Sequence, residues 1–573
     1  MGEAVGGCGR GIHCQEIIKR GLRTAYKVFG RQQRGCGWGY HSIVKSAPSP
    51  ASARRWRPAL TAVTLCTAAA FAFAAPADPL QKLDANRLPT LGDTARQDLS
   101  PVLERKLGEM IMRDVRRDSA YLDDAPIIEY LNNFGSALVA AVPGARGETN
   151  ADFSFFAMRD GNLNAFALPG GFIAAHTGLL VAAQNESELA GVMSHEIGHV
   201  TQRHIARSLG QQKQDMLLPL AAMILAALAA KSSPDAAMGV LMGGQGLAIQ
   251  RQLNFGRDAE READRVGIQI MAAGGYDTTG MVGFFKRLQS ATRLSGDIPA
   301  HLAHLSSHPL TAERITDMQA RIREIPKKPR IDNLDFQLIR ARARVLQDET
   351  VSGRRDTRIA FETQLKEQHR QLQAGAQYGL ALLALRQGNV NEAQSWLDKA
   401  RATMKPKEGV LSTESNVGDG ATLFTGLEID IKLAPGQPAA QMEQAVQLAD
   451  TARQRYPLSR ALAHQYAEAL IAAGKFEEAT RYLREQTQLY REEPKLHDML
   501  AKAYAKQGKI GLQHMALAES YVMAGALPAA VAQLELARKA GDVSFYDQAV
   551  IDARERALKE QQKAEKEDMK DFE

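Results

Sequence analysis

The sequence predicts a mainly α-helical protein (α+β), in which a domain with one small β-sheet precedes a domain of repeated helices. Three observations predict this class. Apolar residues recur at helical spacing through most of the chain after residue 98. A short stretch with alternating apolar residues, 153–175, indicates strands ahead of a helix that starts near Glu186. Ala-rich segments in the C-terminal part carry regularly spaced glycines, which is typical of helical repeats.

The composition is that of a globular protein. The chain has 573 residues, of which 45% are hydrophobic and 24% are charged, and this argues against a disordered, collagen-like or multi-pass membrane chain. Residues 1–77 hold 11 Lys/Arg and two acids, a net charge of +9, and subtracting this from the total of +6 leaves −3 for residues 78–573. Because no domain-sized basic excess remains, no nucleic-acid partner is expected.

Residues 1–77 combine an N-terminal extension with a predicted secretory signal. Three arginines, the last of them Arg57, precede 20 uncharged residues, 58–77, which end in small residues at Ala-x-Ala spacing. This order of regions predicts secretion, with cleavage near residues 74–77. An uncleaved membrane anchor is the alternative, because the uncharged run is about long enough to span a bilayer. All four cysteines precede residue 67, so a cleaved protein would have no thiol.

Residues 98–145 predict two helices, and the stretch that follows predicts a small sheet. Apolar side chains recur three and four positions apart in the first segment. Beyond it, Asp160-Gly161 has the composition of a hairpin turn. We expect the strand before this turn to pair with residues 163–168, and residues 172–175 to form a further strand.

Two apolar segments, residues 216–230 and 236–250, follow the helix that starts near Glu186. Each is too short to span a bilayer alone, and the second contains four glycines. A buried or self-packing helical hairpin fits this composition. A mobile flap next to the functional site fits it as well, and such a flap would allow peripheral membrane contact through residues 216–250.

The C-terminal part is predicted as an array of helix pairs. Gly474 and Gly508 lie 34 residues apart, which is the period of tetratricopeptide helix-turn-helix repeats. Gly388 and Gly525 have similar surroundings, and an irregular helical bundle is the alternative. Closely spaced prolines indicate a boundary near residue 326. We therefore divide the chain into the N-terminal segment 1–77, a first domain over 78–325, a helical connection over 326–360, a repeat domain over 361–545 and a charged tail over 546–573.

The strongest local signal is His195-Glu196-Ile197-Gly198-His199, in an apolar helical context. Residues four apart project from one face of a helix, so His195 and His199 can give two nitrogen ligands to one zinc ion. Glu196 lies beside that face, where its carboxylate can take a proton from a zinc-bound water. Zinc lowers the pKa of bound water to roughly 7, which makes hydroxide available at neutral pH. Because so short a pattern also arises by chance, it requires a third ligand elsewhere.

A second motif, Asp258-Ala-Glu260-Arg-Glu262-Ala-Asp264, offers that ligand. Glu260 and Asp264 lie one helical turn apart. Glu260 could complete a three-ligand site, and Asp264 could accept a hydrogen bond from the second nitrogen of a ligand histidine. Glu262 is expected on a solvated helix face. We expect one zinc ion per chain.

Together, His195-Glu196-x-x-His199 and Glu260-x-x-x-Asp264 resemble the motifs of the M48 family of zinc metallopeptidases. The resemblance implies a zinc endopeptidase with ligands His195, His199 and Glu260, a catalytic Glu196 and a supporting Asp264. It also implies a zincin-like fold, in which a small sheet lies beside the active-site helix of a helical domain.

With its secretion signal and C-terminal repeats, the chain looks like the periplasmic members of this family. That likeness implies degradation of misfolded or unfolded outer-membrane proteins and help in their assembly. It also implies that the repeats recruit these clients or the outer-membrane barrel assembly machinery. The alternative from a different class is a periplasmic chaperone or scaffold, in which the repeats bind and the metal site is latent or regulatory.

Two further segments resemble parts of the family's site. Asn164-Ala165-Phe166-Ala167 resembles the strand that borders the cleft, and an exposed edge strand can bind an extended substrate as an additional strand. An ordinary core strand is the alternative. His308, in Ser307-His308-Pro309-Leu310, resembles a histidine near the metal. It could occupy the open zinc position and keep the enzyme latent, hydrogen-bond the tetrahedral intermediate, or be structural.

The remaining histidines of this region are not expected to bind metal. His204 is nine residues from His195 and would lie about 180° away from it on a continuous helix. His301 and His304 are expected at the surface. His176 is expected to contact a helix cap.

Overall fold

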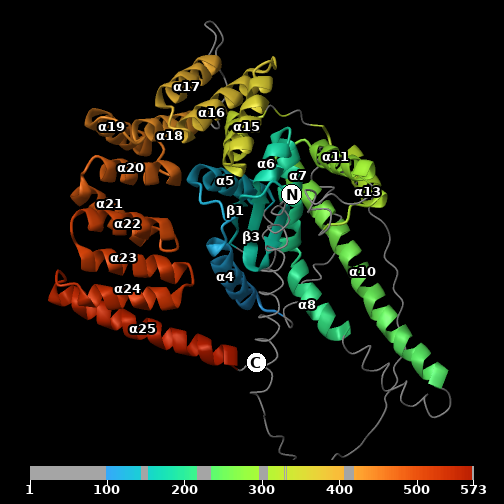
Figure 1. Ribbon diagram of the computed structural model, residues 1–573. Coiled ribbons are helices and arrows are strands. Elements are labelled where there is room, and N and C mark those ends of the chain that lie inside the picture. Colours follow the sequence, from blue (N-terminus) through green and yellow to red (C-terminus); the bar gives the residue numbers. More distant parts are fainter. Residues whose placement is uncertain are drawn as a thin grey trace, which may run out of the picture. The chain divides into compact units, whose positions relative to one another are not determined.

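The computed structural model describes residues 99–142, 152–215, 234–295, 308–327, 330, 332–405 and 419–570 (Figure 1). The described part is mainly helical with a small three-stranded sheet, as predicted. The predicted leader, the apolar segment 216–230, His301 and His304 lie outside the described residues. Within the described segments, no helix combines the length and apolar character that crossing a membrane would require.

Two helices open the described part, as their periodicity predicts: α4 (Pro101–Arg117) and α5 (Ala125–Ala141). The side chains of Ser100 and Asp124 each accept a hydrogen bond from the backbone N–H three residues later. The first backbone N–H groups of a helix have no partner within the helix, and these bonds satisfy one of them in each case. Each helix also has a proline in its first turn, and proline has no N–H group to satisfy.

The sheet has the order β1-β3-β2, with β1 (Ser154–Met158), β2 (Ala165–Leu168) and β3 (Phe172–His176). β3 pairs in parallel with β1 and antiparallel with β2. The predicted hairpin between β1 and β2 is therefore wrong, because β3 lies between them. The tight turn lies instead between β2 and β3, in η2 (Pro169–Gly171), where Gly170 and Gly171 have φ values of 77° and 94° that other residues rarely adopt.

One helix, α7 (Glu186–Thr201), is the buried centre of this region. It packs mainly against β2 and against two later helices, α10 (Pro234–Ala273) and α11 (Thr279–Ser295). A Cβ on Gly198 would lie 3.0 Å from the carbonyl oxygen of Ala263, and one on Gly267 would lie 3.1 Å from the backbone nitrogen of His195. These glycines let α7 and α10 approach closely, which brings the acidic motif to the two histidines. The helices here are α6 (Thr177–Ala182), α7 (Glu186–Thr201), α8 (His204–Asp215), α10 (Pro234–Ala273), α11 (Thr279–Ser295) and α13 (Ala312–Arg323).

The apolar segment 236–250 belongs to α10. This helix runs for 40 residues and continues from that segment into the acidic motif. The glycines of the segment therefore do not interrupt the helix. The other half of the predicted hairpin, 216–230, lies outside the described residues.

The later part of the chain forms successive helices (Figure 1), and short turns join them wherever all the residues between two helices are described. At the four predicted turn glycines φ lies between 70° and 82°, and the N–H of the following residue bonds to a carbonyl five residues back. The predicted turns are thus confirmed, while their assignment to the tetratricopeptide type stays a prediction. The helices are α14 (Leu334–Gln347), α15 (Val351–Gln364), α16 (Arg370–Arg386), α17 (Val390–Met404), α18 (Ala421–Lys432), α19 (Ala439–Arg455), α20 (Arg460–Ala472), α21 (Phe476–Leu489), α22 (Pro494–Lys506), α23 (Ile510–Met523), α24 (Leu527–Lys539) and α25 (Phe545–Lys570).

One apolar core continues from the sheet region into the helices after residue 326, with buried residues from Leu122 to Ile431. A buried ion pair lies within this part. Arg342 of α14 donates hydrogen bonds of 2.8 and 2.9 Å to Asp124 and one of 3.2 Å to the Tyr378 hydroxyl of α16. The segment predicted as a connection therefore packs with the sheet region, and our division of the chain into domains stays a prediction.

The segment predicted as a charged tail is helical as far as residue 570, within α25. It is not wholly solvated. Ile551 and Leu558 are fully buried and pack against apolar residues of α24. The first half of α25 therefore covers the end of the helical array.

Candidate active site

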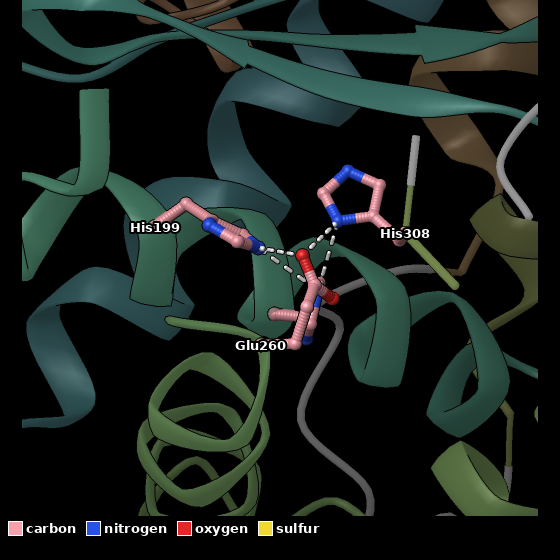
Figure 2. Close-up of side chains that lie close together, drawn as sticks. His199, Glu260 and His308 are labelled. Atoms are coloured by element: carbon pink, nitrogen blue, oxygen red, sulfur yellow. Dashed lines mark hydrogen bonds and ion pairs between the residues drawn. The ribbon is translucent and has the colours of Figure 1, made fainter. Parts of the chain in front are cut away.

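Four side chains converge beside the sheet: His195 and His199 of α7, Glu260 of α10, and His308 just before α13. Figure 2 shows three of them, His199, Glu260 and His308. One nitrogen or carboxylate oxygen from each lies within 4.8 Å of the others. The Nε2 atoms of His195 and His199 are 3.0 Å apart, and the oxygens of Glu260 lie 3.3 and 3.5 Å from them. Nδ1 of His308 lies 2.9 Å from Oε1 of Glu260. The structure thus brings the predicted ligands and His308 together.

The donor atoms and their spacing fit a divalent cation. Zinc binds nitrogen and oxygen at about 2.0–2.2 Å, so neighbouring donors of a tetrahedral site lie about 3.3–3.6 Å apart. The separations between the Glu260 oxygens and the two α7 histidines, 3.3 and 3.5 Å, are of this size. Imidazole and carboxylate ligands suit zinc and neighbouring transition metals. The cluster can therefore hold a metal ion.

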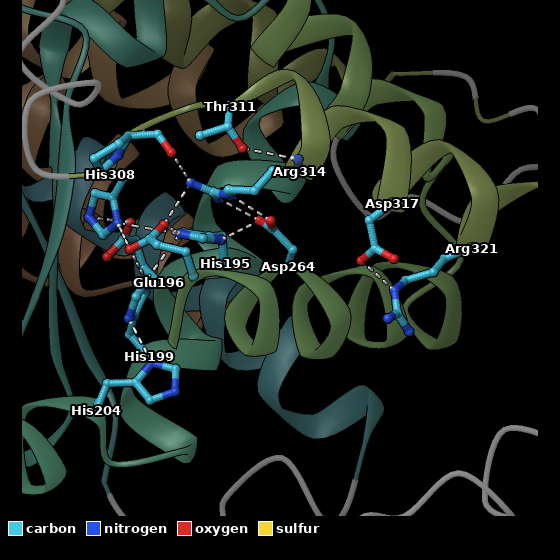
Figure 3. Close-up of polar contacts among 12 residues, drawn as sticks. His195, Glu196, His199, His204, Asp264, His308, Thr311, Arg314, Asp317 and Arg321 are labelled. Carbon is cyan, nitrogen blue, oxygen red and sulfur yellow. Dashed lines mark hydrogen bonds and ion pairs between the residues drawn. The ribbon is translucent and has the colours of Figure 1, made fainter. Parts of the chain in front are cut away.

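Asp264 and Arg314 hold two of these side chains in place (Figure 3). Oδ1 of Asp264 lies 3.0 Å from Nδ1 of His195, which is the contact that the spacing predicts. Arg314 of α13 donates two hydrogen bonds of 2.8 Å to Asp264, and its guanidinium lies 2.8 Å from Glu260. Nothing in the sequence pattern indicates Arg314, which lies 50 residues from Asp264 in the chain. Only the packing of α13 brings it to the site.

The charges of the cluster shift the pKa values of its groups in different directions. Burial lowers the pKa of His195, but hydrogen bonds with Asp264 and Glu260 outweigh burial and raise it to about 10. Burial lowers the pKa of His199 well below its usual range, and the positive charges of His195 and His308 add to this. Burial opposes ionisation of Glu260, yet His308 and His195 hold its pKa far below the usual range. Glu260 is therefore a stable anion at the centre of the cluster.

Glu196 lies next to the cluster and is only 1% exposed. Its Oε1 lies 3.6 Å from Nε2 of His308 and, among the described residues, has no hydrogen-bond partner. Burying a carboxylate oxygen without a partner is costly, so such a group is often retained for chemistry. The position of Glu196 allows it to accept a proton from a molecule bound at the cluster.

His204 and Glu262 lie closer to the site than the sequence predicts. α7 ends at Thr201, so His204 begins a second helix, α8, and is not on the far side of a continuous one. Its Nδ1 lies 2.8 Å from Nδ1 of His199 (Figure 3). Its Nε2 lies 3.1 Å from Glu262, which is partly buried and also accepts a 2.7 Å hydrogen bond from Arg207. The expected solvated position of Glu262 is therefore wrong.

His176 is the N-cap residue of α6, in agreement with its expected place beside a helix start, although its side chain makes no capping hydrogen bond. The ring is 3% exposed and packs edge-on against Phe166. Its Nδ1 lies 3.6 Å from Asp160. Burial lowers the pKa of His176 to about 4, so the ring is neutral at pH 7.

β2 borders α7 and forms one edge of the sheet, as expected for Asn164-Ala165-Phe166-Ala167. Among the described strands it pairs only with β3. The N–H of His176 donates to the carbonyl of Asn164 at 3.0 Å, and hydrogen-bonded pairs alternate along an antiparallel ladder. Ala165 and Ala167 therefore direct their backbone groups away from β3, toward the open edge.

All four clustered side chains belong to the part of the chain that matches the model of a known protein family. The model of peptidase family M48 matches residues 134–322. The beta-barrel assembly-enhancing protease of Escherichia coli strain K12 is 31% identical over 470 residues, which cover 82% of this chain and 91% of that protein. The chain belongs to peptidase family M48.

Two further relatives agree with this assignment. The beta-barrel assembly-enhancing protease of Yersinia pestis is 30% identical over 467 residues, which cover 82% of this chain and 90% of its own length. A Vibrio cholerae relative is 38% identical over 286 residues, 50% of this chain and 56% of its own. As a member of family M48, the protein is a metalloendopeptidase.

Proposed function

We propose that this M48 peptidase is a zinc endopeptidase that acts in the periplasm on misfolded outer-membrane proteins and assists their assembly. The convergence of His195, His199 and Glu260 carries the proposal, and these three residues would hold one zinc ion per chain. A bound zinc ion polarises a carbonyl group and makes water nucleophilic. The relatives named beta-barrel assembly-enhancing proteases support a role at the outer membrane, and the predicted secretory signal supports the periplasm.

The other residues of the site would position the substrate and move protons. Glu196 would take a proton from the attacking water and then donate it to the leaving amine. β2 would bind an unfolded segment as an additional strand next to α7. Asp264, clamped by Arg314, would keep His195 in its ligand orientation.

The helical array after residue 361 would recruit unfolded outer-membrane proteins or the barrel assembly machinery. A succession of helix pairs presents an extended surface for a peptide or protein partner. The alternative, a chaperone or scaffold with a latent metal site, assigns the whole function to that surface.

The direct test uses the purified chain from residue 78. It should contain about one zinc per molecule and cleave an unfolded outer-membrane β-barrel protein, and a chelator should abolish this cleavage. A folded protein that binds no zinc and cuts no unfolded client would contradict the proposal.

Ala167→Pro tests the role of the edge strand. The substitution removes one outward-facing N–H, and a proline is tolerated where an edge strand makes no ladder bond. Loss of one substrate hydrogen bond of roughly 1.4 kcal/mol should raise KM about 10-fold. Ala167→Ser, which keeps the N–H, is the matched control. Equal KM values for the two variants would show that the substrate does not pair with β2 at this position.

His308→Ala separates the two functional roles considered for this histidine. Nδ1 of His308 points into the cluster and lies 3.4 Å from Nε2 of His195. This position supports the latent role, in which the side chain fills the place that a substrate must reach. In that role, only the small fraction of molecules in which His308 has moved away can bind substrate. Removing the imidazole should then raise kcat/KM about 10-fold or more. A fall in kcat/KM at unchanged zinc content would instead favour a hydrogen bond to the reaction intermediate.

A further inference from the structure

The structure places a second histidine, His204, directly behind the candidate ligand His199. We propose that His204, held by Glu262, is a positioning residue that sets the tautomer and the ring orientation of His199 for metal binding. The inference rests on the proposed metal site. It assigns a role to two residues that the zinc-binding motif does not include.

The hydrogen-bond partners allow one consistent arrangement of protons. Nε2 of His199 must present a lone pair to a metal, so the ring proton of a neutral His199 is on Nδ1. That proton points at Nδ1 of His204, 2.8 Å away, which must then be an acceptor. The proton of a neutral His204 is consequently on Nε2, which lies 3.1 Å from the acceptor Oε2 of Glu262. In this series of hydrogen bonds, the direction of each bond determines the direction of the next.

Glu262 is well suited to be the fixed end of this chain. Arg207 donates a 2.7 Å hydrogen bond to its Oε2, and Arg265 lies 3.8 Å from its Oε1. These cations favour the ionised form, which accepts hydrogen bonds and donates none. A carboxylate that can only accept forces the proton of His204 onto the nitrogen facing it. The arrangement extends the usual carboxylate–histidine–metal unit by one imidazole.

The two candidate ligands of α7 are therefore oriented in different ways. His195 contacts its carboxylate, Asp264, directly at 3.0 Å. His199 reaches Glu262 only through His204. Both carboxylates lie on α10, and each is bonded by an arginine, Arg314 in the first case and Arg207 in the second.

A left-handed turn between α7 and α8 makes the contact with His204 possible. Arg203 has a φ of 53°, a conformation that is uncommon for a residue with a side chain. Its guanidinium donates hydrogen bonds of 3.1 and 3.0 Å to Glu104, and both residues are buried. On an unbroken helix His204 would project about 140° away from His199, so the turn is needed for the two rings to meet. Residues held in sparsely populated backbone conformations cluster at functional sites.

The test compares His204→Gln with His204→Leu in the full chain. Glutamine can accept from His199 through Oε1 and donate to Glu262 through Nε2, whereas leucine fills a similar volume without either bond. We measure zinc affinity by competition with a chromophoric chelator. His204→Leu should lower the affinity about 10- to 100-fold, the usual effect of losing such a partner, and His204→Gln should stay within about 3-fold of the parent.

Control variants separate this effect from misfolding and from failure of the metal site itself. His514→Leu removes a partly buried histidine of α23, whose partner is Gln533 at 2.7 Å, and should leave zinc affinity unchanged. Thermal unfolding in excess chelator compares the folded state of all variants without metal. If His204→Leu does not fold, Glu262→Ala tests the other end of the chain of bonds and should lower zinc affinity about 10-fold.

Three results would overturn the inference. The first is a folded His204→Leu variant that binds zinc as tightly as the parent protein. The second is an equal loss of zinc affinity in His204→Gln and His204→Leu. The third applies if His204→Leu does not fold, and it is a Glu262→Ala variant with the zinc affinity of the parent. A parent protein that binds no zinc would instead reject the proposed metal site. That result is seen in the parent protein without any variant. Failure of the metal site can therefore be distinguished from failure of the positioning role of His204.

Discussion

Glu196→Gln is expected to reduce peptide cleavage about 10²- to 10⁴-fold, the contribution of a general base, while the protein still binds zinc. Glutamine has nearly the shape of glutamate, so the buried position beside the cluster stays filled. It cannot accept a proton from water at neutral pH. The measurement is kcat/KM for an unfolded outer-membrane protein, together with zinc content and thermal stability.

The control for this variant is Glu313→Gln. Glu313 lies on α13, and its side chain is 71% exposed and pairs with Arg261. Removing this charge should leave kcat/KM unchanged. Parental cleavage by Glu196→Gln would exclude Glu196 as the base. Loss of cleavage without loss of outer-membrane protein assembly in cells would favour the scaffold alternative, in which the helical array does the work.

Arg342→Met is expected to destabilise the protein by about 3–5 kcal/mol, because it leaves the carboxylate of Asp124 buried without its cation. The side chains of this pair are 10% and 11% exposed, and Asp124 also caps α5. Methionine keeps most of the volume of the arginine stem. The midpoint of the first unfolding transition in urea, followed by circular dichroism, should fall accordingly.

Arg358→Met provides the matched comparison for this ion pair. Arg358 forms a 3.1 Å ion pair with Glu392, and the side chains are 32% and 35% exposed. Solvent screens such a pair, so its loss should cost about 1 kcal/mol or less. Equal effects of the two variants would mean that the Arg342–Asp124 pair contributes no more than a surface pair. The connection between α5 and α14 would then depend on apolar packing alone.

Much of the local structure could be predicted because it depends on residues close in the chain. The periodicity of residues 98–145 predicts α4 and α5, and the turn glycines predict where helices of the array end. The same holds for His195 and His199, since the helix repeat alone places residues four apart on one face. The motif around Glu260 could be proposed as the source of the third metal ligand, because carboxylates are residue types that bind metals.

The sheet could not be predicted correctly from the local pattern. The apolar residues of 153–175 indicate strands, but β1 is buried at four consecutive positions, so no solvated face of this strand helps to assign its partner. The turn composition of Asp160-Gly161 favoured a hairpin, but β3 lies between β1 and β2 and pairs with both. Strand order is a property of the packed sheet and not of any single turn.

The sequence by itself therefore determined the main helices, the two-histidine face and the family to which the chain belongs. Only the tertiary structure decided which distant side chains complete the site. Arg314 reaches Asp264 across 50 residues, and His308 reaches His195 across 113. His204 meets His199 because the helix is interrupted at Arg203, where a buried ion pair with Glu104 holds an uncommon φ. Such contacts depend on how whole elements pack, because the free energy that fixes them comes from burial and pairing between segments that are remote in the chain.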